Sequence, residues 1–210
     1  MRYDWKEITT LAYLTLLELD MHEFPIVTKK IKLKDVIISS YQKYAELTGV
    51  SVEQISLEYE FDDALLIKEL RPGLKLVLYN KDKYDARLKH TLLHEVGHIK
   101  RDHKKHGDQE EVEAHFFAAQ ANAPNVIIKA ITRRGYKVDI HFLIEHFGLS
   151  EESAKKKMEY LGKYGFEHTN DFDDALLLQF SDYINIKYTP KTSHFHDDYY
   201  DEKERERETW

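Results

Sequence analysis

A short segment, His94-Glu95-Val96-Gly97-His98, carries three side chains that are suited to metal chemistry. On a helix, residues four apart lie on one face, so the imidazoles of His94 and His98 can reach one ion. Zinc with three protein ligands keeps a fourth position for water and lowers the pKa of that water to about 7. Glu95 can then take the proton and pass it to a leaving amine. The segment predicts a zinc-dependent hydrolase.

A site of this kind needs a third protein ligand. Cysteine is absent, so that ligand must be His, Asp or Glu. His103 follows the second histidine one residue too early for the metzincin spacing, and no glycine lies between them, so we disfavour it. The next predicted helix offers three carboxylates, namely Glu110, Glu111 and Glu113. Helical periodicity does not rank these three, and His115 is a further candidate on the same helix.

The pattern of apolar residues around the motif changes from strand-like to helical at Asp85. Helices are predicted upstream of the motif at residues 5–20 and 35–48. Alternating apolar residues at Ile55–Phe61 and apolar runs at 64–70 and 75–80 predict three strands. The helix with the motif is predicted at 85–103, and later helices at 109–121, 125–134, 139–147, 150–163 and 171–186. This order is typical of an α+β fold, mostly helical with a small sheet of about three strands before the catalytic helix.

Composition and charge narrow the class of protein further. The formal net charge is −7, which argues against broad binding to nucleic acids, because that needs a basic surface. The sequence has no apolar run long enough for a membrane span and no signal-peptide pattern at its start. Together with the lack of cysteine, these features predict a cytoplasmic protein. The highly charged segment 191–210 is expected to be a disordered acidic tail.

The motifs resemble those of the ImmA/IrrE family of metallopeptidases, in the same order along the chain. Arg87 is followed by HTLLHEVGHI from His90, by EAHFFA from Glu113 and by Ala-Pro at 123–124. Segments further away also match, namely FPI at 24–26, LVLYN at 76–80 and HFGLSEESAKKKMEYL at 146–161. The sequence departs from the family at His90, where Phe is usual, and at His115, where Asn is common. These departures concern the fit of the substrate rather than the metal.

The resemblance implies a zincin-like fold, Zn²⁺ as cofactor and cleavage of a protein. In that family the Glu before Ala binds the metal, so the implied ligands are His94, His98 and Glu113, with Glu95 as catalytic base. The expected substrate is a regulatory protein, a helix-turn-helix repressor of a mobile element or phage. The expected division is a zincin-like metallopeptidase core at 1–135 that includes the N-terminal helices, a helical region at 136–190 and the tail at 191–210.

Two other functions fit parts of the sequence. The chain could be an anti-repressor or protein-binding module that acts without cleavage and whose zinc site is structural. It could also be a regulator that reads DNA through a helix-turn-helix at residues 139–162. The acidic balance and the acids that open the second helix of that pair, Glu151 and Glu152, count against direct binding of DNA.

Overall fold

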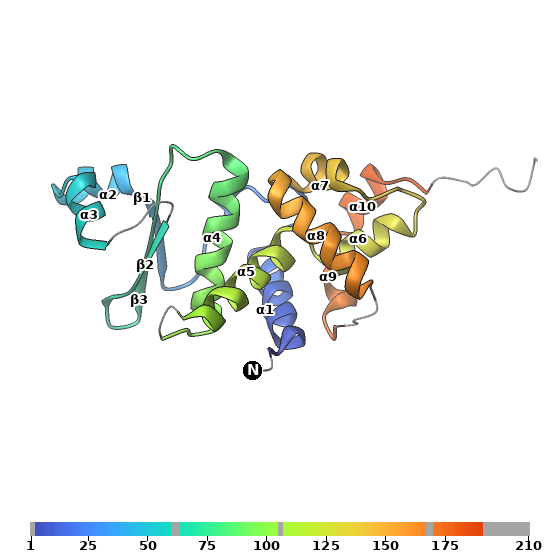
Figure 1. Cartoon of the computed structure of the whole chain (residues 1–210), viewed down its shortest axis with the longest axis horizontal. Coiled ribbons are helices and arrows are strands. Elements are labelled where there is room, and N and C mark those ends of the chain that lie inside the picture. The colour runs from blue at the N-terminus through green and yellow to red at the C-terminus, as the bar shows by residue number, and fades with distance from the viewer. Residues whose placement is uncertain (1–2, 60–63, 105–106, 167–169, 191–210) are drawn as a thin grey trace, which may run out of the picture.

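A computed structural model describes residues 3–59, 64–104, 107–166 and 170–190. Its elements are, in order, α1 (Trp5–Glu18), η1 (Thr28–Lys30), β1 (Val36–Ser40), α2 (Tyr41–Thr48), α3 (Val52–Tyr59), β2 (Ala64–Arg71), β3 (Leu74–Tyr79), α4 (Asp85–Lys100), α5 (Asp108–Asn122), α6 (Asn125–Thr132), α7 (Ile140–Phe147), α8 (Glu151–Tyr164), α9 (Asp173–Gln179) and α10 (Ser181–Lys187). In Figure 1 the sheet with α2 and α3 lies at one end, α6 to α10 lie at the other, and α1, α4 and α5 lie between them. The fold is α+β and mostly helical, as predicted. The predicted tail at 191–210 lies outside the described residues.

The three strands form one mixed sheet in the order β1-β3-β2. The central strand, β3, runs parallel to β1 and antiparallel to β2. Its side chains alternate between two faces: Val77 belongs to the main core, whereas Leu76 and Leu78 pack with Tyr41 and Ile55 in a smaller cluster. Both faces of β3 are therefore covered, which explains why its sequence is continuously apolar rather than alternating.

Of two elements predicted before β2, one is right only in part and one is wrong: the helix predicted at 35–48 is present as α2 from Tyr41 to Thr48. Residues 36–40, predicted as the start of a helix, form β1, because their β-branched run pairs with β3. The predicted strand at Ile55–Phe61 is instead helix α3 as far as Tyr59, and Phe61 lies outside the described residues. A capping box starts this helix: Gln54 N donates to Ser51 Oγ at 3.1 Å, and Ser51 N donates to Gln54 Oε1 at 2.9 Å. The strand count of about three is right, but β1 replaces the first predicted strand.

The helices that follow the sheet agree with the prediction to within a few residues, with two differences. The helix with the motif ends at Lys100 rather than at 103, and the helix predicted at 171–186 is two helices, α9 and α10, which meet at Phe180. The main hydrophobic cluster extends from Ile8 of α1 to Tyr188, so it includes residues on both sides of position 135. The domain division at that position stays a prediction. In the part of the chain that the structure describes, every helix is too short or too polar to span a membrane.

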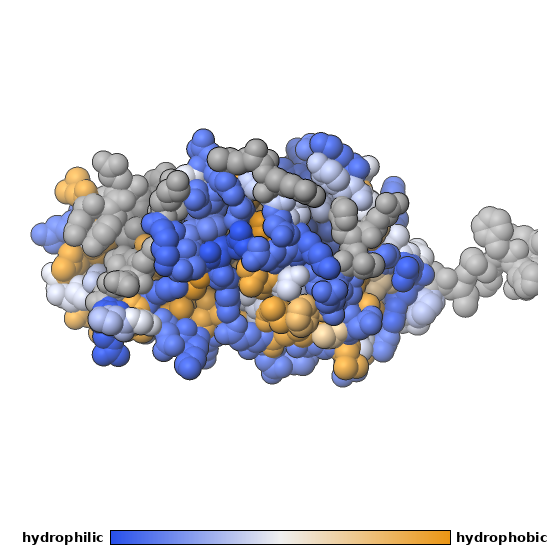
Figure 2. All heavy atoms as spheres, turned by 90° about the horizontal axis from the view of Figure 1, so that it is seen from below, coloured by the Kyte–Doolittle hydropathy of each residue, from blue (hydrophilic) through white to orange (hydrophobic). Residues whose placement is uncertain are grey.

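A buried lysine connects the helix with the motif to the C-terminal helices. Lys89 of α4 donates from Nζ to the carbonyl oxygens of Phe147 at 3.1 Å and Gly148 at 2.9 Å, where α7 ends. Carbonyl groups at a helix C-terminus have no partner within the helix, so this ammonium supplies one. On the outside, Figure 2 shows a face on which hydrophilic side chains surround separate hydrophobic groups. The apolar residues Leu92, Leu93 and Val96 of α4 are buried.

A glycine within the motif allows α4 and α5 to pack closely. A Cβ atom at Gly97 would lie 3.2 Å from Ala114 Cα and 3.2 Å from Phe117 Cβ. Both atoms are fixed to the backbone of α5, so they can move away only if that helix moves. Gly97 therefore sets the distance between the two helices that carry the predicted metal ligands.

We expect Gly97→Ala to destabilise the protein, although alanine favours helix formation. Overpacking of a tight contact costs about 1–3 kcal/mol, which exceeds the gain of about 1 kcal/mol from replacing a helical glycine. Gly162→Ala in α8 is the matched control, because a Cβ there would meet nothing within 4 Å. Urea unfolding of both variants measures the difference, and equal stabilisation by the two substitutions would contradict close packing at Gly97.

Candidate metal centre

The two histidines of the motif converge at one point, as helical spacing predicts. His94 and His98 lie one turn apart on α4, and their Nε2 atoms are 3.0 Å apart. Both residues are buried, with His98 only 1% exposed. Because each Nε2 carries a lone pair in the neutral imidazole that donates from Nδ1, two such atoms can bind one cation.

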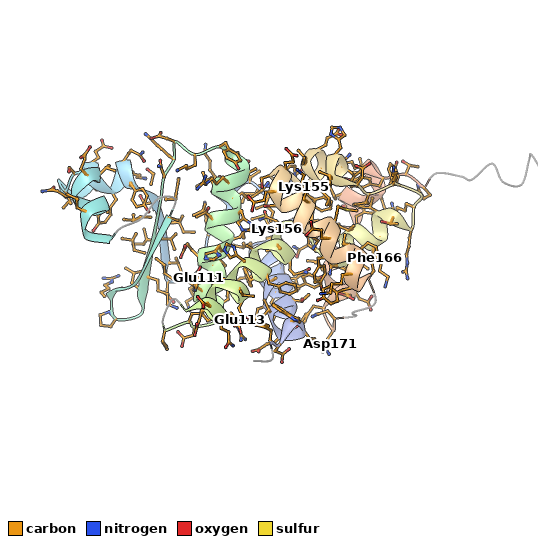
Figure 3. All side chains as sticks on the ribbon, in the orientation of Figure 1. Glu111, Glu113, Lys155, Lys156, Phe166 and Asp171 are labelled. Atoms are coloured by element: carbon orange, nitrogen blue, oxygen red, sulfur yellow. The ribbon has the colours of Figure 1, made fainter. Side chains whose placement is uncertain are left out.

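Glu111 of α5 is the carboxylate that meets this histidine pair. Its Oε2 atom lies 3.2 Å from His94 Nε2, and its Oε1 atom lies 3.3 Å from His98 Nε2. Figure 3 shows Glu111 and Glu113 near the crossing of α4 and α5. A tetrahedral zinc ion with bonds of about 2.0 Å separates its ligand atoms by about 3.3 Å. The three separations are close to that value, with one carboxylate oxygen near each Nε2 atom, so these two imidazoles and this carboxylate can converge on a zinc ion.

Glu113, the ligand implied by the resemblance, lies away from the histidine pair and against a cation. Its Oε2 accepts from Arg101 Nε and Nη2, both at 2.9 Å, and from His103 Nε2 at 3.2 Å. Its Oε1 accepts from Gln109 Nε2 at 3.0 Å. Burial acts to raise the pKa of Glu113, but the hydrogen bonds from Gln109, His103 and Arg101 outweigh it and lower the pKa. Glu113 is therefore a buried, ionised carboxylate.

His103 connects Glu113 to the histidine pair. Its Nδ1 atom lies 2.9 Å from His98 Nδ1, on the side of that ring opposite the converging Nε2 atoms. Its Nε2 atom faces Glu113. His103 therefore contacts His98 at Nδ1 and not at the converging Nε2 atoms, in agreement with its exclusion as a metal ligand by sequence spacing.

Glu95, the predicted general base, follows His94 directly on α4 and is 8% exposed. A buried carboxylate beside a metal position is the arrangement that base catalysis on a water molecule needs. The sequence motif alone locates this residue, since its position relative to His94 follows from the helix itself.

His115 is the site residue whose role sequence reasoning left open. With His94 and Glu111 it forms a group in which one ligand atom from each residue lies within 4.8 Å of the others. It also contacts His90, whose Nε2 is 3.3 Å from His115 Nδ1. Burial lowers the pKa of His115, and burial together with the nearby His115 lowers the pKa of His90 to about 4. The spacing of four between Glu111 and His115 was a signal in the sequence that these two share a face.

The site therefore consists of a helix with two histidines one turn apart, crossed by a helix with a converging carboxylate. The family model of peptidase M78, the IrrE N-terminal-like domain, matches residues 45–159, which is more than half of the 210 residues. The chain belongs to this family, and the resemblance to ImmA/IrrE proteins is confirmed. Neither the search of curated proteins nor that of solved structures gave a match.

Proposed function

We propose that the protein is a zinc-dependent endopeptidase in which His94, His98 and Glu111 hold the metal. The observation that carries this proposal is the convergence of these side chains: the two Nε2 atoms lie 3.0 Å apart, and the two carboxylate oxygens of Glu111 lie 3.2 and 3.3 Å from them. Glu111 thereby replaces Glu113 in the ligand set that the resemblance implies. Family membership supports a metallopeptidase and hence a protein substrate.

Each residue of the site then has a defined task. Zinc with two nitrogen ligands and one carboxylate supplies Lewis acidity and a water of lowered pKa. With such an ion bound, the Glu95 carboxylate would be the group that accepts a proton from the attacking water. The same carboxylate returns the proton to the nitrogen of the leaving amine. These two proton transfers allow water to cleave the peptide bond without a covalent intermediate.

Glu113 and His103 orient the ligand His98 in this proposal. His98 bound through Nε2 carries its proton on Nδ1, which donates to His103 Nδ1. His103 then carries its proton on Nε2, which donates to Glu113, and Arg101 neutralises that carboxylate. Such outer partners fix the ring and the protonation of a metal-bound histidine. The buried polar chain behind His98 thus has a function although Glu113 does not touch the metal.

The substrate we propose is a helix-turn-helix repressor of a mobile element or phage, which rests on the family resemblance. We also propose a cytoplasmic location. A DNA-reading role for α7 and α8 has little support, because Glu151 and Glu152 open α8 as exposed acids paired with Lys155 and Lys156 at 2.6 Å. The alternative is a non-proteolytic anti-repressor with a structural zinc site. Cleavage of the repressor distinguishes the two, because an anti-repressor with a structural zinc site binds without cutting a peptide bond.

Purified protein should carry about one zinc per chain, and removal of that zinc should abolish cleavage of the proposed repressor substrate. A chelator strips the metal, elemental analysis counts it, and gel electrophoresis follows the repressor. Added zinc should restore cleavage, because the ligands remain in place. Cleavage at an unchanged rate by metal-free protein would contradict the proposal.

A further inference from the structure

A second feature of the molecule adjoins the proposed metal centre: a cavity of about 610 Å³ between α4, α5 and α8. Part of its wall is apolar, with Phe116 of α5, Tyr160 of α8, and Leu149, which precedes α8. His115 also lines it, and the ring of His115 lies 4.3 Å, centroid to centroid, from the ring of His94. A peptide bound at the metal could therefore place a neighbouring side chain in this cavity.

Three buried polar side chains on the cavity wall have polar atoms that form no hydrogen bond among the described residues. These are Gln120 and Asn122 of α5, each 1% exposed, and Lys157 of α8, 4% exposed. The unpartnered atoms are Gln120 Oε1, both polar atoms of the Asn122 amide, and Lys157 Nζ. A buried polar group without a hydrogen bond is costly, so three of them on one cavity point to a ligand that satisfies them.

The charges at the cavity favour an anion. Arg87, Lys156 and Lys157 line it together with one acid, Glu152, and that acid is paired with Lys156 at 2.6 Å. Burial lowers the pKa of Lys157 to about 7, because the charged amine has lost water and gained no counter-charge. A carboxylate from a ligand would supply that counter-charge.

We propose that this cavity is a specificity subsite for an acidic side chain, Glu or Asp, of the peptide substrate. The carboxylate binds Lys157 Nζ and the Asn122 Nδ2 amide, and Gln120 Oε1 accepts a backbone N–H of the peptide. The methylene groups of the side chain pack on Phe116 and Tyr160. This inference rests on the proposed peptidase function, because that function places a peptide beside His94.

The first test measures binding without cleavage. Zinc-loaded protein is titrated at pH 6 with two N-acetylated, C-amidated tripeptides, Ala-Glu-Ala and Ala-Gln-Ala, and amide chemical shifts in NMR report affinity. The Glu peptide should bind about tenfold more tightly than its Gln counterpart, as expected for a charge-assisted contact. Equal affinities, or no binding of either peptide at millimolar concentration, would overturn the subsite.

Lys157→Met should abolish this preference because it removes the cation and keeps the length of the side chain. Its melting temperature should be no lower than that of the original protein, since the change removes an amine that burial penalises. Lys155→Met is the matched control: this lysine lies two residues earlier on α8, is exposed, and pairs with Glu151 at 2.6 Å. A preference for Glu that survives in Lys157→Met would contradict the proposal.

A second test separates the subsite from the peptidase function. The zinc-loaded protein is incubated with a library of peptides from a digested proteome, and mass spectrometry maps the cleavage sites. Asp and Glu should be enriched at one fixed position from the cleaved bond, and Lys157→Met should cleave without that enrichment. Binding preference without any cleavage would refute the peptidase function and leave the acidic subsite standing. Cleavage without enrichment would refute the subsite alone.

Discussion

Glu111→Ala should lose zinc, whereas Glu113→Ala should keep it with reduced affinity. The Glu111 carboxylate lies 3.2 and 3.3 Å from the two Nε2 atoms of the histidine pair, so its removal takes away a ligand. Glu113 reaches the pair only through His103, and loss of such an outer partner costs about 10–100-fold in metal affinity. Removal of a direct ligand should cost more than about 100-fold by the same scale. Competition with a chromophoric chelator measures both affinities.

Glu110→Ala is the control, because Glu110 lies in the same first turn of α5 and has no role in the site. It should bind zinc as the original protein does. The opposite ranking, with zinc lost in Glu113→Ala and retained in Glu111→Ala, would contradict the proposed ligand set. It would support the assignment that the family resemblance implies.

Glu95→Gln should lower the cleavage rate about 100-fold or more, the usual cost of losing a general base. Glutamine keeps the shape of the side chain but cannot take a proton from water. Zinc content and the unfolding midpoint should stay close to those of the original protein, because Glu95 is not a ligand in the proposed site. Initial rates with the repressor as substrate, together with elemental analysis, measure these effects.

The outcome that contradicts this role is a Glu95→Gln variant that keeps both its zinc and its rate. Another residue would then have to act as base. A variant that loses zinc along with activity would instead place Glu95 among the ligands. The two measurements on one variant therefore separate base from ligand.

The parts of this fold that depend on local sequence were predicted well. His94 and His98 share a face because α-helical geometry places residues four apart together, and the α+β order follows from the change of period at Asp85. Residues 36–40 were misassigned because a strand depends on its partner, here β3, which lies more than thirty residues away. For α3 the local signal was present, since Ser51 and Gln54 form a capping box, but the alternation from Ile55 outweighed it.

Which residues form the site depends on how α4 and α5 cross, and the spacing of residues along the sequence does not predict that crossing. Glu111 and Glu113 are two residues apart on α5, but the former contacts His94 and the latter pairs with Arg101. Gly97 allows the close approach of the two helices. Lys157 is a second example. It belongs to a run of charged residues in α8, a pattern typical of an exposed face, yet it is only 4% exposed in the fold. Tertiary packing decides both cases.

The most direct test of the peptidase proposal is mass spectrometry of a candidate helix-turn-helix repressor, the substrate proposed above, after incubation with zinc-loaded protein or with Glu95→Gln. The account predicts that the former yields two fragments from one cut peptide bond, and that the variant yields almost none although it carries the same zinc. Repressor activity in cells is followed in parallel. Relief of repression by both proteins without fragments from either would contradict the account and favour an anti-repressor that acts by binding.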